Sequence, residues 1–264
     1  MNSLSNAMRS DGFKLVRSAA LVSGLMMSTL AHAGFAEFVI RGAATINHPA
    51  PGQTEFVLDA SGEKAALGSN DINGQTLGSL QSVAITRHDD VTRFPAGSGP
   101  AVGPYLNFWI TDGNGNFAVA ANEPSNPEMQ GYYQNGYDLS FAELSTMTVK
   151  LYENANLSWV PNSGAGLTFA SLAGFTIQAP TAAQLSVGWA GLGSGAPREL
   201  GTNMAYGVNW VFGDTLSNYV SGDQGYVVSN ASVTAAGDVP EPASLALVAL
   251  GIAAMGLRRQ RKNG

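Results

Sequence analysis

The sequence predicts an all-β protein. We expect a β-sandwich with jelly-roll-like connections and one or two short helices, plus an N-terminal signal peptide and a short C-terminal hydrophobic helix. Turn-forming pairs such as Asn73-Gly74, Asp112-Gly113 and Asn135-Gly136 divide the chain at short intervals. Runs rich in Val, Ile, Thr and aromatic residues lie between these turns. The long amphipathic helices that parallel α/β folds require are scarce.

Eight segments are expected to form strands, and two of them alternate clearly. In 82–87, Val83 and Ile85 share one face, and in 146–152 apolar residues occupy every second position. A period of two predicts strands with one face buried against a second sheet. The expected strands are 36–41, 55–58, 80–87, 105–111, 117–121, 146–153, 174–178 and 225–234.

Two short helices are expected. Thr181 can cap a helix within 181–192, and 140–144 can form a further helical turn. Segment 191–218 is rich in glycine and is predicted to be irregular, with Trp210, Val211 and Phe212 as its apolar centre.

The N-terminus has the features of a secretory signal. Basic residues precede an apolar run of 13 residues, 18–30, which is short for a membrane span of about 20. An Ala-His-Ala triplet then ends at Ala33. Cleavage is therefore expected between Ala33 and Gly34, so that residues 1–33 form a signal peptide and 34–238 form the central domain.

The C-terminal segment, 239–264, has three parts in order. A Pro-Glu-Pro triplet precedes an apolar run, 245–257, and a basic tail ends the segment. A helix over that run is roughly 20 Å long, whereas a bilayer core is about 30 Å thick. The basic residues would hold their end in the cytoplasm. The triplet is Pro240, Glu241 and Pro242, and the basic residues are Arg258, Arg259, Arg261 and Lys262.

This order of triplet, short membrane helix and Arg-rich tail resembles the PEP-CTERM sorting signal of Gram-negative bacteria. The resemblance implies export by the secretion machinery and processing by an exosortase, a membrane cysteine transpeptidase. It also implies a transient stage in the inner membrane through the C-terminal helix, and a final place at the cell surface or in the extracellular matrix. Proteins with this tail tend to come from bacteria that make exopolysaccharide. The resemblance implies no activity for the central domain.

The central domain is strongly acidic. Residues 34–238 contain 6 basic and 17 acidic residues, which leaves a net charge of −11, whereas the whole chain has −6. An acidic surface repels phosphate backbones, so nucleic-acid binding is disfavoured. The chain has no Cys, which excludes disulfides, zinc–thiolate sites and a cysteine nucleophile.

One loop has the spacing of a calcium site. Asp112, Asn114, Asn116 and Glu123 place oxygen ligands at positions one, three, five and twelve of a calcium-binding loop. However, Phe117 occupies the position that should be Gly, and the segments on either side of the loop are predicted to be strands. A β-hairpin is therefore the favoured interpretation, with Ca²⁺ as the alternative and no other cofactor expected.

A cluster of aromatic residues suggests glycan binding. Tyr132, Tyr133 and Tyr137 lie among Gln, Asn and Asp residues in an expected loop. Exposed rings stack on sugars, and amides bind their hydroxyl groups. The alternative is that these tyrosines pack over the rim of the sandwich.

No catalytic constellation is recognised, so no enzyme is expected. His88, beside Asp89, could be a general base, but no Gly-x-Ser-x-Gly motif marks a nucleophile. Carboxylate pairs could form a glycosidase, although none has a defining motif. The carboxylates considered for such a pair are Glu123, Glu128, Glu143 and Glu153.

The sequence therefore favours a structural or adhesive protein of the cell surface or matrix, associated with exopolysaccharide or biofilm. A carbohydrate- or calcium-binding module is the first alternative. A secreted glycoside hydrolase is the second.

Overall fold

The computed structural model describes residues 34–89, 103–122, 136–152, 156–186, 196–213 and 224–237. These residues form two antiparallel sheets with two short α-helices, so the all-β prediction is confirmed. The described residues lie within one compact unit, 31–264. The expected signal peptide and C-terminal hydrophobic helix fall outside the described residues. Within the described part, no helix is long and apolar enough to cross a membrane.

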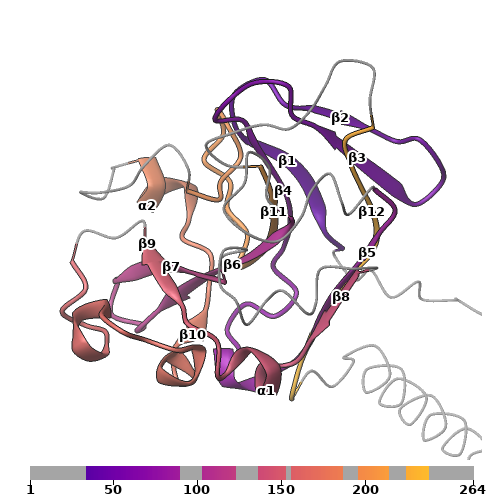
Figure 1. Ribbon diagram of the computed structural model, residues 1–264. Coiled ribbons are helices and arrows are strands. Elements are labelled where there is room, and N and C mark those ends of the chain that lie inside the picture. The colour runs from indigo at the N-terminus through magenta and orange to yellow at the C-terminus, as the bar shows by residue number, and fades with distance from the viewer. Residues whose placement is uncertain are drawn as a thin grey trace, which may run out of the picture. The chain divides into compact units, whose positions relative to one another are not determined.

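The first sheet has seven strands (Figure 1). β10 pairs with β6 beyond the end of β11, on the same side of β6. In spatial order the other strands are β1 (Ala36–Arg41), β4 (Lys64–Ser69), β11 (Val208–Phe212), β6 (Tyr105–Thr111), β7 (Phe117–Asn122) and β9 (Lys150–Tyr152), while β10 is Thr176–Ile177.

The second sheet has five strands, all paired antiparallel. Its long central strand β12 lies between β3 and β5, and a register shift between Ser229 and Ser232 interrupts its pairing with β5. In spatial order the strands are β2 (Thr45–Asn47), β3 (Gln53–Val57), β12 (Tyr226–Ala235), β5 (Leu80–Arg87) and β8 (Gly136–Leu139).

Both expected helices are present, and both begin at hydroxyl caps, of which only Thr181 was expected. Ser140 caps α1 (Phe141–Leu144) in a reciprocal capping box with Glu143. Thr181 accepts a hydrogen bond from the backbone N–H of Gln184 at the start of α2 (Ala182–Ser186). Three 3₁₀ turns complete the described elements: η1 (Leu77–Ser79), η3 (Pro161–Gly164) and η4 (Phe169–Leu172).

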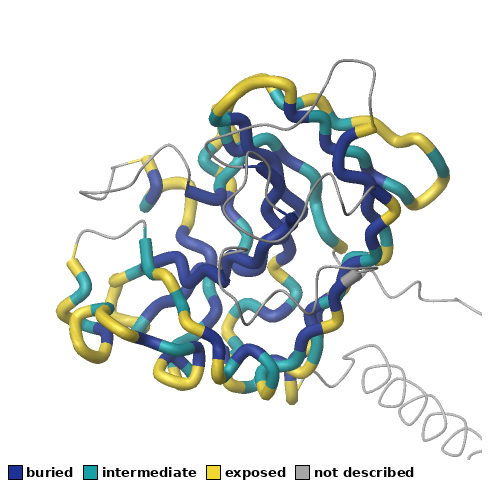
Figure 2. The backbone as a smooth tube through the Cα atoms, in the orientation of Figure 1, coloured by how far each residue is buried: buried dark blue, intermediate teal, exposed yellow. Residues whose placement is uncertain are grey.

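The two sheets pack face to face around one large hydrophobic core. The ring of Phe56 in β3 stacks on Phe212 of β11 with centroids 4.3 Å apart, and Tyr137 of β8 lies 4.9 Å from Trp210 of β11. Both sheets therefore contain many buried residues (Figure 2). The described residues form a β-sandwich, and its jelly-roll connectivity stays a prediction.

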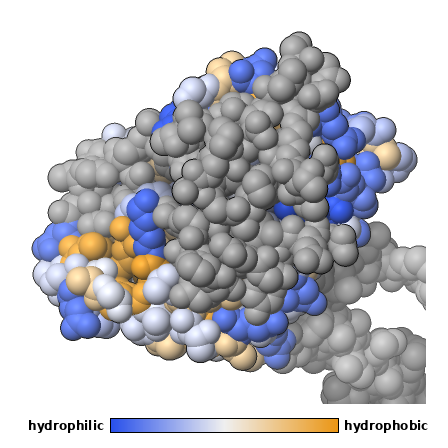
Figure 3. Space-filling model, viewed as in Figure 1, coloured by the Kyte–Doolittle hydropathy of each residue, from blue (hydrophilic) through white to orange (hydrophobic). Residues whose placement is uncertain are grey.

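The seven-stranded sheet is also buried on its outer face. Every residue of β4, β6 and β11 is buried, although strand side chains alternate between faces. One outer cluster gathers around Trp109, and a second gathers around Phe38 and Tyr105. In Figure 3, apolar residues are visible beside β7 and β9, while hydrophilic residues cover the region of β2 and β3.

Four strands were not expected. β4 and β11 do not alternate because both of their faces are buried, and β11 lies inside the segment predicted to be irregular. β2 is short, and β8 lies where a tyrosine loop was expected. The expected strand 146–153 is reduced to Lys150–Tyr152 within the described residues.

Candidate functional site

The predicted calcium loop is the tip of the β6–β7 hairpin. The Asp112 carboxylate accepts hydrogen bonds from the backbone N–H groups of Asn114 and Asn116, at 2.8 and 3.3 Å. It also accepts one from Asn116 Nδ2, at 2.7 Å. Gly113 and Gly115 supply the positive φ angles, 79° and 88°, that this tight turn needs. The carboxylate therefore organises the turn, which accounts for the Asp and Asn residues without a metal.

The electrostatics of Asp112 follow from these contacts. Slight burial raises the pKa of its carboxyl group, but the hydrogen bonds from Asn116 and Asn114 favour the ionised form and leave the pKa below its ordinary value. Among the described residues, no group of three or more His, Asp or Glu could hold a metal ion. Glu123, the fourth expected ligand, lies outside the described residues, so the calcium site stays a prediction.

Tyr137 does not lie in an exposed loop. It belongs to β8, pairs in register with Ile85 and is only 4% exposed. Its hydroxyl donates to the carbonyl oxygen of Pro104 at 3.0 Å. Because the ring packs against Trp210 inside the sandwich, the expected loop placement of Tyr137 is corrected, whereas its glycan contact stays a prediction. Tyr132 and Tyr133 lie outside the described residues.

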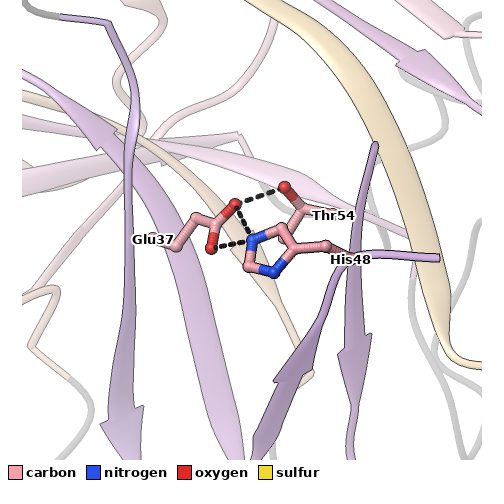
Figure 4. Close-up of polar contacts among 3 residues, drawn as sticks. All are labelled: Glu37, His48 and Thr54. Carbon is pink, nitrogen blue, oxygen red and sulfur yellow. Dashed lines mark hydrogen bonds and ion pairs between the residues drawn. The ribbon is translucent and has the colours of Figure 1, made fainter. Parts of the chain in front are cut away.

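A polar cluster joins the two sheets at one edge (Figure 4). Glu37 of β1 accepts a hydrogen bond from the Thr54 hydroxyl of β3 at 2.5 Å. The same carboxylate lies 2.9 Å from His48 Nε2, in the connection between β2 and β3. The carboxylate stands between the hydroxyl and the imidazole, whereas activation of a nucleophile needs the imidazole in the middle. This arrangement fits a hydrogen-bonded link between the two sheets.

His88 and Asp89 do not pair with one another. His88 Nε2 lies 2.8 Å from the Ser229 hydroxyl on the surface, whereas Asp89 turns inward to the guanidinium of Arg87. Both charged side chains of that ion pair are fully buried. Burial lowers the pKa of Arg87, but Asp89, with smaller contributions from Tyr137 and Tyr226, raises it above its ordinary value. Asp89 therefore does not orient the imidazole as the sequence suggested, and Asp90 lies outside the described residues.

Several described carboxylates have structural partners. Buried Glu63 accepts hydrogen bonds from the backbone N–H groups of Ala43, Asp59 and Ala60, which holds two chain segments together. Glu143, a glycosidase candidate, is occupied in the capping box of α1. The other three candidates, Glu123, Glu128 and Glu153, lie outside the described residues.

The structure places two buried asparagines side by side on the outer face of the seven-stranded sheet. Asn107 of β6 and Asn209 of β11 are paired in register and fully buried. Asn209 Nδ2 donates to the carbonyl oxygen of Tyr206 at 2.7 Å, but Asn209 Oδ1 and both amide atoms of Asn107 have no partner. An unpaired buried polar atom costs about 1–3 kcal/mol of stability. No local sequence pattern indicated this pair, because β11 was not recognised as a strand.

Comparisons with known proteins identify one part of the chain. Neither the curated proteins nor the solved structures yielded a match. A family model, the PEP-CTERM protein-sorting motif, matches residues 238–262. This motif marks exported proteins that an exosortase processes, so the chain is an exported exosortase substrate whose central domain has no recognised family.

Proposed function

We propose that this protein is a structural or adhesive component of the cell surface or extracellular matrix, where it associates with exopolysaccharide in a biofilm. The sorting motif at 238–262 is the observation that carries this proposal. The motif begins shortly after β12. Ala236 is still held in the fold, because its backbone N–H donates to the carbonyl oxygen of Ser79 at 2.7 Å. The motif is therefore attached to the folded sandwich by very few residues.

The contacts of the sandwich favour a binding or structural role over hydrolysis. Glu37, Glu63 and Glu143 bind hydroxyl, imidazole or backbone N–H groups of the protein itself. A glycosidase needs two carboxyl groups that face a common cleft, about 5–10 Å apart. Carboxylates engaged in this way stabilise the fold and are not free for proton transfer.

Replacement of the sorting triplet tests the first half of the proposal. Glu241→Ala should block processing, so that the unprocessed chain stays in the inner membrane through its C-terminal helix. Asp238→Ala is the matched control, because it removes the same charge outside the triplet and should be processed normally. Cell fractionation with detection of both chain lengths measures the result. Unchanged release of the Glu241→Ala protein would refute sorting through this triplet.

Cosedimentation tests the second half. The mature, released protein should sediment with exopolysaccharide from the producing bacterium. Comparison of calcium with a chelator tests the alternative of a calcium-dependent module, and Asp112→Ala should abolish binding only if the hairpin tip holds the ion. A fall in polymer size during incubation would instead support the glycoside hydrolase alternative. An absence of cosedimentation under both conditions would exclude the exopolysaccharide association.

A further inference from the structure

Three turns in the described part of the chain place an Asn or Asp directly before a glycine. They are Asn73-Gly74, Asp112-Gly113 and Asn114-Gly115. In such a pair the backbone nitrogen of the glycine can attack the side-chain carbonyl carbon of the preceding residue, because glycine has no Cβ to obstruct the approach. An asparagine that reacts in this way loses its amide, which makes asparagine a thermolabile residue. The surroundings of each pair decide whether the reaction occurs in the folded protein.

Both reacting groups of Asn73-Gly74 are held in place. The Gly74 N–H, which would supply the nucleophile, donates to the carbonyl oxygen of Ile177 at 2.9 Å. The Asn73 amide donates to Asn70 Oδ1 at 2.9 Å, and its own Oδ1 packs so closely on Gly207 that a Cβ added there would lie 2.1 Å away. The nitrogen and the carbonyl carbon can therefore meet only when this turn opens locally.

Asp112-Gly113 is protected by the turn of the β6–β7 hairpin. The Gly113 N–H donates to the Thr111 hydroxyl at 3.1 Å. Slight burial raises the pKa of Asp112, but hydrogen bonds from Asn116 and Asn114 leave that pKa below its ordinary value. A carboxyl group closes the ring in its protonated form, so the ionised carboxylate is unreactive at neutral pH.

Asn114-Gly115 lies at the tip of the same hairpin and lacks this protection. Both residues are exposed, and the Gly115 N–H has no hydrogen-bond partner among the described residues. The Asn114 amide makes one long contact, 3.4 Å from its Nδ2 to the carbonyl oxygen of Asp112. Beyond its chain neighbours, no atom lies within 4 Å of a Cβ added at Gly115. Solvent therefore reaches the nucleophile, and the side chain can turn toward it.

We propose that Asn114 is a site of spontaneous deamidation in the exported protein. The Gly115 nitrogen loses its proton to water or hydroxide and attacks Asn114 Cγ. The new N–Cγ bond closes a cyclic succinimide, while the Cγ–Nδ2 bond breaks and ammonia leaves. Water then opens the ring at either carbonyl group and gives aspartate or isoaspartate. The reaction consumes water and releases ammonia, needs no enzyme, and is independent of the association with exopolysaccharide.

Deamidation changes the hairpin tip in charge and in backbone length. Either product adds a carboxylate near that of Asp112. In the isoaspartate product the backbone runs through the side-chain carbons of residue 114 and is longer by one carbon atom. This displaces the Asn116 N–H, which donates to Asp112 Oδ1 at 3.3 Å in the unmodified turn.

Peptide mapping of the mature, released protein tests this site. The folded protein is incubated at mildly alkaline pH, and mass spectrometry of proteolytic fragments then locates each amide that has been lost. Synthetic peptides with aspartate or isoaspartate at position 114 identify the products. Asn114 should convert roughly tenfold or more faster than Asn73, because the hydrogen bonds at Asn73 and Gly74 must open first. In protein unfolded in guanidinium chloride, the two rates should become similar.

Asn114→Gln is the matched variant, because it keeps a neutral amide at the tip but must close a larger ring, which forms more slowly. The hairpin peptide of this variant should keep its mass over the same period. A mass gain that persists there would assign the reaction to another residue and overturn the site.

Two further outcomes would also overturn the proposal. Equal rates at Asn73 and Asn114 in the folded protein would contradict the contrast between the two turns. Conversion of Asn114 only after unfolding would show that the hairpin protects it. Faster conversion at Asn114 in the folded protein, with similar rates after unfolding, supports the site.

Discussion

The two sheets of this sandwich differ in how many faces they bury. The five-stranded sheet packs one face on the core and leaves much of the other exposed, as the alternating burial of β5 and β12 shows. The seven-stranded sheet buries both faces in β4, β6 and β11. Antiparallel sheets commonly have one solvated face, so the second buried face marks the seven-stranded sheet as the unusual layer.

This difference in burial determines whether an outward polar side chain reaches solvent. On the five-stranded sheet, outward polar side chains meet at the surface, as when Ser82 donates to Asp138 at 2.7 Å. On the seven-stranded sheet, Asn107 and Asn209 point outward but are enclosed, and three of their amide atoms have no partner. A polar residue costs little stability on the outer face of the first sheet and more on the enclosed face of the second.

The test with the largest expected effect replaces one residue on each of three faces. Trp109→Ala, on the outer face of the seven-stranded sheet, should cost about 3–5 kcal/mol of unfolding free energy, as much as Trp210→Ala in the central core. Thr234→Ala, outward on the five-stranded sheet, should change it by less than about 0.5 kcal/mol. Urea unfolding measures all three. A cost below about 1 kcal/mol for Trp109→Ala would show that the outer cluster is no second core.

The next test contrasts two aspartates of the five-stranded sheet region. Asp89→Asn removes the charge that faces buried Arg87 and should cost about 1.5–3 kcal/mol, the value of a hydrogen bond between charged groups. Asp138→Asn on the outer face of the same sheet should stay within about 0.5 kcal/mol. Equal effects in thermal unfolding would contradict the assignment of one pair to the interior and the other to the surface.

A smaller effect is expected at the polar cluster between the sheets. Thr54→Val keeps the shape of the side chain but removes the hydroxyl that donates to Glu37, and it should cost about 1 kcal/mol. Thr45→Val on exposed β2 provides the matched control and should be nearly neutral. If both variants unfold at the same urea concentration, the contact between β1 and β3 adds nothing to the packing of the sheets.

The smallest effect concerns pH at the β6–β7 hairpin. Because the pKa of Asp112 is lowered in the folded protein, its contribution to stability is present above the unfolded pKa of about 3.9 and is lost as pH falls through the folded value. The carboxylate is exposed, so this contribution should stay below about 0.5 kcal/mol. Asp112→Asn should therefore be slightly less stable than wild type at about pH 6, and the difference should vanish in acid. A difference that grows in acid would contradict the lowered pKa.

Sequence patterns predicted strands correctly where one face of the strand is exposed to solvent. The expected bounds of β1 and β5 match the structure, and in β5 the expected apolar face, Val83 and Ile85, is the buried one. The expected bounds of β6 also match, although both of its faces are buried. The capping residue Thr181 was also recognised, because a cap is a local hydrogen-bond pattern. Alternation and capping depend on neighbours in the chain, so they can be read before the fold is known.

The same patterns failed where packing decides. β4 and β11 show no alternation, since residues on both of their faces are buried, and the glycine-rich segment that contains β11 was predicted to be irregular. Tyr137 was placed in a loop because its neighbours are polar, but its pairing with β5 turns it into the core. The partner of His88 is Ser229, 141 positions away in the chain, which no local pattern could indicate.

By itself, the sequence determined the all-β class, the Thr181 cap and the sorting motif at 238–262, because each depends on residues close together in the chain. Only the tertiary structure decided which sheet is enclosed on both faces and which carboxylates are engaged. It alone also placed Asn107 beside Asn209. Burial and hydrogen-bond satisfaction are properties of surfaces that meet across sheets, so they exist only after strands distant in the chain have packed together.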